Sequence, residues 1–181
     1  MAPAQARLLV VLLALLAACT GGRYTVQREG ASATDYSPTD RVRVMLAKPG
    51  VADETAARTV SAKIVAALMT RHGDVALVPT SNDAEALEAA RAAQATFLIS
   101  PTILEWHDGH APPFTADRIK VRMDLRDPNT GEVINTATFE NVSSIYAGFD
   151  TQPDALLDAT FDRAVAALIT GGSTGRGVAQ Q

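Results

Sequence analysis

RIKVRMDLR, residues 118–126, is the segment with the clearest pattern in the chain. Four apolar residues alternate there with charged ones: Ile119, Val121, Met123 and Leu125. Because successive side chains of a strand point to opposite faces, this period of two predicts a strand with one buried and one solvated face. Residues 127–131 have proline and glycine where a type I turn with a following bulge needs them, and residues 133–139 return as a second strand. We therefore predict a β-hairpin.

Before the hairpin, the apolar pattern changes period repeatedly, which predicts alternating strands and helices. Acidic residues at the start of the first helical pattern and an Asn82–Glu85 capping box at the start of the second mark helix beginnings. The predicted elements are a strand at 41–47, a helix at 53–71, a strand at 75–78, an alanine-rich helix from Asn82, and a strand at 96–106 with a bulge at Pro101.

After the hairpin, residues 142–146 are an optional edge strand, and a last helix is predicted to begin at Asp150 or Thr151 with Pro153 in its first turn. Its inner face is periodic: Leu157, Phe161, Ala164, Val165 and Leu168. The element order is β-α-β-α-β-β-β-(β)-α. Two crossovers give parallel neighbours and the hairpin gives antiparallel ones. This predicts an α/β (α+β) fold, a mixed parallel and antiparallel sheet of about five or six strands with three helices packed on it.

The start of the chain carries the pattern of a bacterial lipoprotein signal. An apolar run over residues 8–16 leads into Leu16, Ala17, Ala18 and Cys19, which form a lipobox. We expect residues 1–18 to be removed and the thiol of Cys19, the only cysteine in the chain, to carry a lipid anchor. The alternative is an ordinary secretory signal cut nearby, with Cys19 left as a free thiol. Thr20, rather than aspartate, after the cysteine favours the outer membrane, facing the periplasm, by resemblance to other lipoproteins.

The remaining chain divides into three parts by composition. Residues 19–38 have no sustained period and are predicted to be a flexible tether with a root-mean-square span of about 25 Å. Residues 39–170 should form one globular domain, and residues 171–181 a disordered tail. The formal net charge of −4 argues against a nucleic-acid partner, and no second apolar run approaches the length of a membrane span. We expect no cofactor.

Several sequence blocks resemble the bacterial lipoprotein family catalogued as domain of unknown function 4823. They are residues 90–93 and 97–99, the block Pro101-Thr102-Ile103-Leu104 with Trp106 and Asp108, residues 117–119, and the hairpin end at 130–133. A second tryptophan of the family is replaced here by Phe114. The element order is also similar to the small periplasmic domains of the curli secretion lipoprotein, the penicillin-binding-protein activator lipoproteins and the N-terminal domain of TolB. These are interaction modules, so the resemblance implies an envelope protein partner.

Two surfaces are candidate binding sites. The charged face of the predicted hairpin carries a basic row, Arg118, Lys120, Arg122 and Arg126, which could extend to Arg41 and Arg43. This row could recognise phosphate head groups, lipopolysaccharide or an acidic partner, or it could be a solvated face whose cations pair with carboxylates such as Glu132 or Glu140. Trp106 and Phe114 could form an exposed aromatic hot spot, or Trp106 could close the end of the core.

Two further patterns point toward catalysis or metal binding, and we favour neither. Glu105, His107, Asp108 and His110 have ligand chemistry for a divalent ion, but they lack a recognisable metal-site spacing. Residues 171–175 match a G-x-S-x-G nucleophile elbow by letters, without the strand, helix, acid and histidine that this motif requires. The sequence therefore predicts a non-catalytic accessory or protein-interaction module of the cell envelope. The alternatives are an envelope hydrolase or metal-dependent enzyme using the 105–110 loop, and a lipid- or lipopolysaccharide-binding module.

Overall fold

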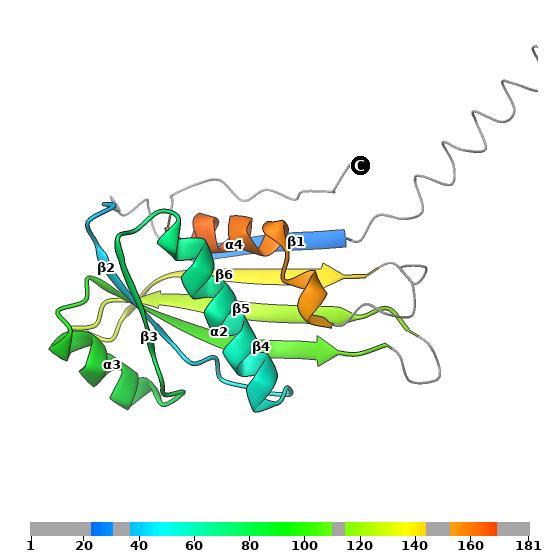
Figure 1. Ribbon diagram of the computed structural model, residues 1–181, viewed down its shortest axis with the longest axis horizontal. Helices are drawn as coiled ribbons and strands as arrows, with labels where there is room; N and C mark the ends of the chain where they lie inside the picture. The colour runs from blue at the N-terminus through cyan, green and yellow to red at the C-terminus, as the bar shows by residue number, and fades with distance from the viewer. Residues whose placement is uncertain (1–22, 31–36, 110–114, 144–152, 170–181) are drawn as a thin grey trace, which may run out of the picture.

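The computed structural model describes residues 23–30, 37–109, 115–143 and 153–169 (Figure 1). The strands are β1 (Arg23–Gly30), β2 (Arg41–Met45), β3 (Asp74–Val78), β4 (Phe97–His107), β5 (Arg118–Arg126) and β6 (Val133–Val142). The helices are α2 (Glu54–Met69), α3 (Asp83–Ala92) and α4 (Ala159–Ile169), with a short 3-10 helix η1 (Pro153–Leu156) before α4. This mixed six-stranded sheet with three helices confirms the predicted fold class.

The six strands lie in the order β1-β6-β5-β4-β2-β3. β2 is parallel to both β3 and β4, as the two helical crossovers require, whereas β4, β5, β6 and β1 are antiparallel. The β5–β6 hairpin is confirmed, including a register shift between Leu125 and Arg126. The bulge in β4 lies between Ile103 and Glu105, so the prediction of a bulge at Pro101 is wrong. Pro101 stays in register with Met123 of β5. Its carbonyl accepts from Lys48 N on the other side of β4, beyond the end of β2, where no strand requires an N–H from the proline.

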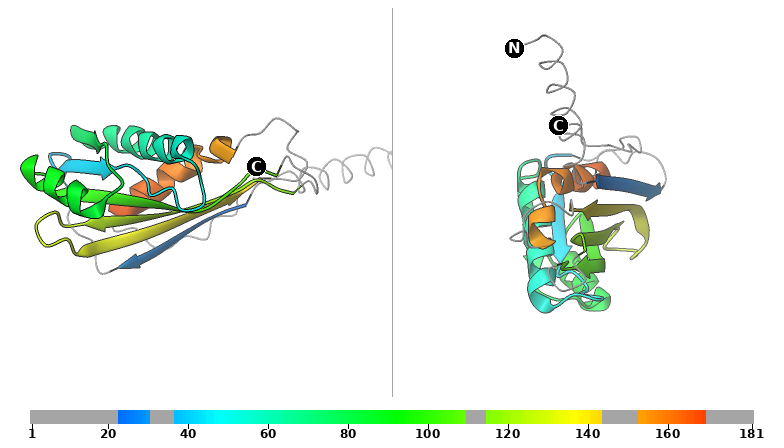
Figure 2. Two further views of the ribbon diagram at one scale, coloured as in Figure 1. Left: turned by 90° about the horizontal axis from the view of Figure 1, so that it is seen from below. Right: turned by 90° about the vertical axis from the view of Figure 1, so that its right-hand side faces the viewer.

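The helices form two layers on the sheet (Figure 2). α2 and α4 cover one face, and their apolar residues merge with Ile119, Val121, Met123 and Leu125 in the main core. α3 packs on the opposite face, where Ala86 and Ala90 contact Met45, Val78 and Leu98. The small side chains of the alanine-rich α3 allow this close approach. On the α3 side, none of the described helices covers β5, β6 and β1.

Side chains cap the helices at the predicted places, with one correction. Asp53 accepts from Ala56 N at 2.7 Å at the start of α2, and Asn82 accepts from Ala84 N and Glu85 N at the start of α3. The predicted continuous last helix is instead η1 followed by α4. Asp158 causes the restart, because its carboxylate accepts from both the backbone N–H and the hydroxyl of Thr160. The predicted caps Asp150 and Thr151, and residues 144–146 of the optional edge strand, lie outside the described residues.

β1 is the largest departure from the sequence prediction. Residues 23–30 were assigned to a flexible tether, but they form a strand paired with β6 along its whole length, from Arg23 opposite Val142 to Gly30 opposite Asn135. Tyr24 and Val26 pack against the main core. The first strand that the structure describes therefore begins at Arg23, four residues after Cys19.

Candidate functional site

An open cavity of about 200 Å³ lies between the start of α2, the end of β4 and η1. We call it the Trp106 cavity. The start of α2 contributes Asp53, Thr55, Ala56 and Thr59, β4 contributes Trp106, and η1 contributes Pro153 and Asp154. Small-molecule pockets usually measure about 300–1,000 Å³, so this cavity is suited to a single side chain or head group.

Three elements meet at the Trp106 cavity because each is held by a different part of the sheet. Trp106 pairs with Ile119 across the β4–β5 ladder, which places the indole on the helix-covered face. There it is half-buried and packs against the main core. η1 is held by Asn141 of β6, which is buried and donates from Nδ2 to the carbonyl of Leu156 at 3.0 Å. Trp106 is thus neither fully exposed nor fully enclosed, so its burial does not decide between the two predicted roles.

The Trp106 cavity is acidic. Asp53 and Asp154 are exposed, and among the residues that the structure describes no lysine, arginine or histidine lines the cavity and neither carboxylate forms an ion pair. A helix N-terminus by itself favours anions. Here, however, the Asp53 carboxylate already accepts from Ala56 N, and Asp154 adds a second negative charge. The electrostatics therefore favour a cation.

The loop after Trp106 is closed by its own polar groups as far as the structure describes it. His107 Nε2 and Thr115 Oγ1 lie 2.6 Å apart, and the buried Asp117 accepts from Gly109 N at 2.8 Å. Glu105 pairs with Arg118 at 3.4 Å. Among the described residues, no three histidine, cysteine or acidic side chains converge as a metal site. Of the four residues in the metal hypothesis, His110 lies outside the described residues. The described ones, Glu105, His107 and Asp108, do not form such a cluster.

The predicted basic row lies on the open face of β5, and each member has an acidic neighbour. The nitrogen-to-oxygen distances are 3.4 Å for Arg118–Glu105, 3.2 Å for Lys120–Glu140, 2.9 Å for Arg122–Asp124, and 3.8 and 3.9 Å for Arg126 to Asp83 and Asp124. These pairs favour the solvated-face interpretation, with Glu140 as one of the predicted partners. Such pairing reduces the positive potential that a phosphate would meet.

Arg41 and Arg43 do not extend the basic row. Both pair with Asp74 of β3, at 3.5 Å and 2.7 Å, on the far side of β4 from β5. The hydrogen bond from Arg43 lowers the pKa of Asp74, and the positive charges of Arg43 and Arg41 act in the same direction. Since the folded state lowers this pKa, the contribution of the pair to stability is present above the ordinary pKa of an aspartate and is lost at lower pH. These residues fasten β3 to β2.

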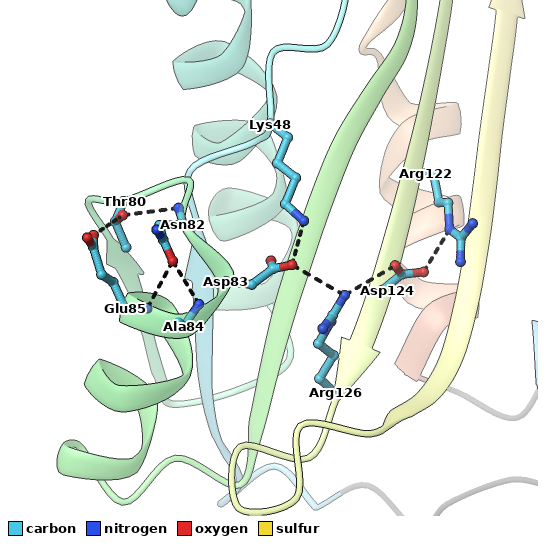
Figure 3. A network of polar contacts seen from close by, with 9 residues as sticks. All are labelled: Lys48, Thr80, Asn82, Asp83, Ala84, Glu85, Arg122, Asp124 and Arg126. Atoms are coloured by element: carbon cyan, nitrogen blue, oxygen red, sulfur yellow. Dashed lines mark hydrogen bonds and ion pairs between the residues drawn. The ribbon is translucent and has the colours of Figure 1, made fainter.

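A chain of charges connects α3 to β5 (Figure 3). Lys48 Nζ contacts Asp83 Oδ2 at 2.7 Å, Arg126 lies between Asp83 and Asp124, and Asp124 also contacts Arg122. Asp124 is only 8% exposed and accepts from Thr136 Oγ1 at 2.8 Å. This network positions α3 on the sheet, so Arg122 and Arg126 of the basic row have a structural role.

The Asp124→Ala substitution is expected to lower the free energy of unfolding by about 1–3 kcal/mol, because it leaves Thr136 and Arg122 without their acceptor and Arg126 with Asp83 as its remaining ion-pair partner. Glu140→Gln is the matched control on the same face. Its pair with Lys120 is about one-third exposed, so its loss should cost less than about 1 kcal/mol. Urea denaturation measures both, and equal effects would show that the network does not contribute as described.

The other predicted site residues cannot be placed by the structure. Leu16, Ala17, Ala18, Cys19 and Phe114 lie outside the described residues. Sequence reasoning missed the role of Asp53, which it treated only as a helix-start residue, and of Asp154, which no local pattern marked. No described helix is long and apolar enough to cross a membrane.

The mixed sheet with helices on both faces is a fold that solved structures also contain. The chain is similar to the PelC dodecamer from Paraburkholderia phytofirmans, with a TM-score of 0.62, 20% identity, and coverage of 81% of this chain and 98% of that one. A point variant of the same dodecamer has a TM-score of 0.64 at 20% identity, with 81% and 99% covered. Protein XCC0632 from Xanthomonas campestris, described by domain of unknown function 330, has a TM-score of 0.50 at 12% identity, with 82% and 95% covered.

These similarities establish a shared fold. No family model matches the chain, and no curated protein matches it. The resemblance to domain of unknown function 4823 is therefore not confirmed.

Proposed function

We propose that this chain is a lipid-anchored, non-catalytic accessory module of the bacterial envelope that binds a protein partner close to the membrane. The carrying observation is the spacing between Cys19 of the lipobox and Arg23, the first residue of β1. Four residues span at most about 14 Å even when fully extended. An anchor on Cys19 would hold the domain against its own membrane, rather than letting it range on the predicted 25 Å tether.

The same spacing gives the domain an orientation. β1 begins opposite Val142, which also pairs with Arg118, and Arg118 pairs with His107. The start of β1 and the end of β4 therefore lie at the same end of the sheet, as Figure 1 shows. Three strand spacings of about 4.8 Å separate them. Anchoring at Cys19 would place the Trp106 cavity on the membrane-proximal side.

PelC uses the shared fold in an assembly described as a dodecamer, which supports a module that associates with other proteins. Partners of this chain thus include further copies of itself. A non-catalytic role is supported by the described polar groups that follow Trp106, because His107 lies within hydrogen-bond distance of Thr115 and Asp117 accepts from Gly109 N. The outer membrane remains our preferred location on the basis of Thr20.

The Cys19→Ser substitution is expected to abolish incorporation of radiolabelled palmitate, because serine has no thiol to form the thioether. The control is Thr20→Ser, which retains Cys19 and should be labelled like the natural sequence. Labelling is measured on the protein isolated from whole cells, and alkaline washing of membranes tests retention in parallel. Persistent labelling of the Cys19→Ser chain would refute the anchor at this position.

A further inference from the structure

We propose that the Trp106 cavity binds a single lysine or arginine side chain of a partner protein. The proposal rests on the proposed function only for the location of that partner near the membrane. Binding itself is a property of the folded chain. The cavity is separate from the basic row, which lies on the opposite face of the sheet, because Trp106 shares its face with Ile119.

The chemistry of the lining selects a long cationic side chain. Asp53 and Asp154 provide two exposed carboxylates without described ion-pair partners, and Trp106 provides an aromatic surface. A lysine or arginine packs its methylene stem on apolar surface while its charged end stays near water and carboxylates. Tryptophan is also the aromatic side chain that attracts a cation most strongly. Ala56 and Pro153 complete an apolar floor for the stem.

The sign of the lining also distinguishes a protein side chain from a lipid head group. The ammonium of an ethanolamine lipid is attached to a phosphate, which would have to approach Asp53 and Asp154. Like charges brought together in this way are repelled. Lysine and arginine carry no neighbouring anion. A cavity of about 200 Å³ accepts one such side chain and is too small for most organic cofactors.

The test uses the fluorescence of Trp106, the only tryptophan in the chain, and therefore reports on this cavity alone. The mature chain, solubilised in detergent, is titrated with acetylated tripeptides containing arginine, lysine, citrulline or glutamate between two glycines. We expect saturable changes with the arginine and lysine peptides only. Citrulline has nearly the shape of arginine without its charge. Equal binding of the citrulline peptide, binding of the glutamate peptide instead, or no saturable change with arginine and lysine would overturn the proposal.

Two variants that replace a carboxylate with a neutral amide localise the binding without disturbing the fold. Asp53→Asn preserves the helix cap, since asparagine caps as well as aspartate, and Asp154→Asn removes a carboxylate with no described partner. Each should raise the half-saturating peptide concentration about two- to fivefold, and the double variant should raise it further. Glu54→Gln is the control, because Glu54 is outside the cavity and pairs with Arg58 at 3.1 Å. Unchanged titrations of the double variant would refute the cavity as the site.

A final experiment distinguishes a protein side chain from a lipid head group as the occupant of the cavity. Vesicles of phosphatidylethanolamine and phosphatidylglycerol are added to the peptide titration. We expect the arginine peptide to bind Trp106 equally well with and without them once peptide bound to vesicles is subtracted. Competition by the ethanolamine lipid would assign the cavity to a head group and overturn the assignment to a protein. Failure of palmitate labelling, by contrast, would refute the anchor and leave the peptide titration unaffected.

Discussion

Replacing Phe161 with alanine is expected to lower the free energy of unfolding by about 3–5 kcal/mol. Phe161 is completely buried in α4, and its ring meets that of Phe139 of β6 edge-on, with 5.1 Å between centroids. Truncation removes both this contact and the apolar surface that fastens α4 to the sheet. The cavity left behind is bordered by α2 and β6, so it cannot close without moving a whole element.

Urea denaturation, followed by far-ultraviolet circular dichroism, measures the Phe161→Ala effect. The control is Met69→Ala at the end of α2, where the side chain is 64% exposed. It removes a large apolar side chain from a helix without opening the core, and it should change stability by less than about 0.5 kcal/mol. If Phe161→Ala lowered the free energy of unfolding as little as the control does, the packing of Phe161 could not be what fastens α4 to the sheet.

Gly50→Ala is expected to cost about 2–4 kcal/mol, although it adds only a methyl group. Gly50 has φ +57°, in the left-handed region, and an added Cβ would lie 2.2 Å from the carbonyl oxygen of Ile103. The backbone of Ile103 is itself bonded to this loop, because Ile103 N donates to the carbonyl of Lys48 at 3.0 Å. The loop must therefore move away from β4, and the start of α2 moves with it.

Gly73→Ala is the matched control for Gly50→Ala. A Cβ at Gly73 meets nothing within 4 Å, and its φ is not in the left-handed region. The substitution should be neutral or slightly stabilising, because alanine reduces the freedom of the unfolded chain. Thermal unfolding separates the two variants, and a Gly50→Ala protein as stable as Gly73→Ala would contradict the close approach of this loop to β4.

The local patterns of the sequence predicted most of the fold. Alternation in residues 118–126 and helical spacing in α2 and α4 reflect burial of one face, which a single segment records by itself. β1 was missed because it holds only Tyr24 and Val26 as apolar residues that pack on the core. It is an edge strand stabilised by pairing with β6, over a hundred residues later in the chain, and no local period records such a pairing.

The Trp106 cavity was beyond local reasoning for the same reason. Trp106 was singled out as an aromatic residue, but its neighbours come from α2 and from η1, which are distant in sequence. Asp154 lines the cavity because Asp158 starts a new helix and leaves η1 as a separate turn. The basic row was recognised from its alternation, yet its pairing with Glu105 and Asp83 depended on the bulge in β4 and the position of α3.

The central claim is that Cys19 becomes the lipidated N-terminus, four residues before the folded domain. Mass spectrometry of the intact protein extracted from membranes tests it most directly. We predict a mature chain that begins at Cys19 and carries a diacylglyceryl group on its sulfur, with N-terminal fragments that locate the added mass on that residue. A membrane-extracted protein that retains residues 1–18, or that has an unmodified thiol at Cys19, would contradict the account.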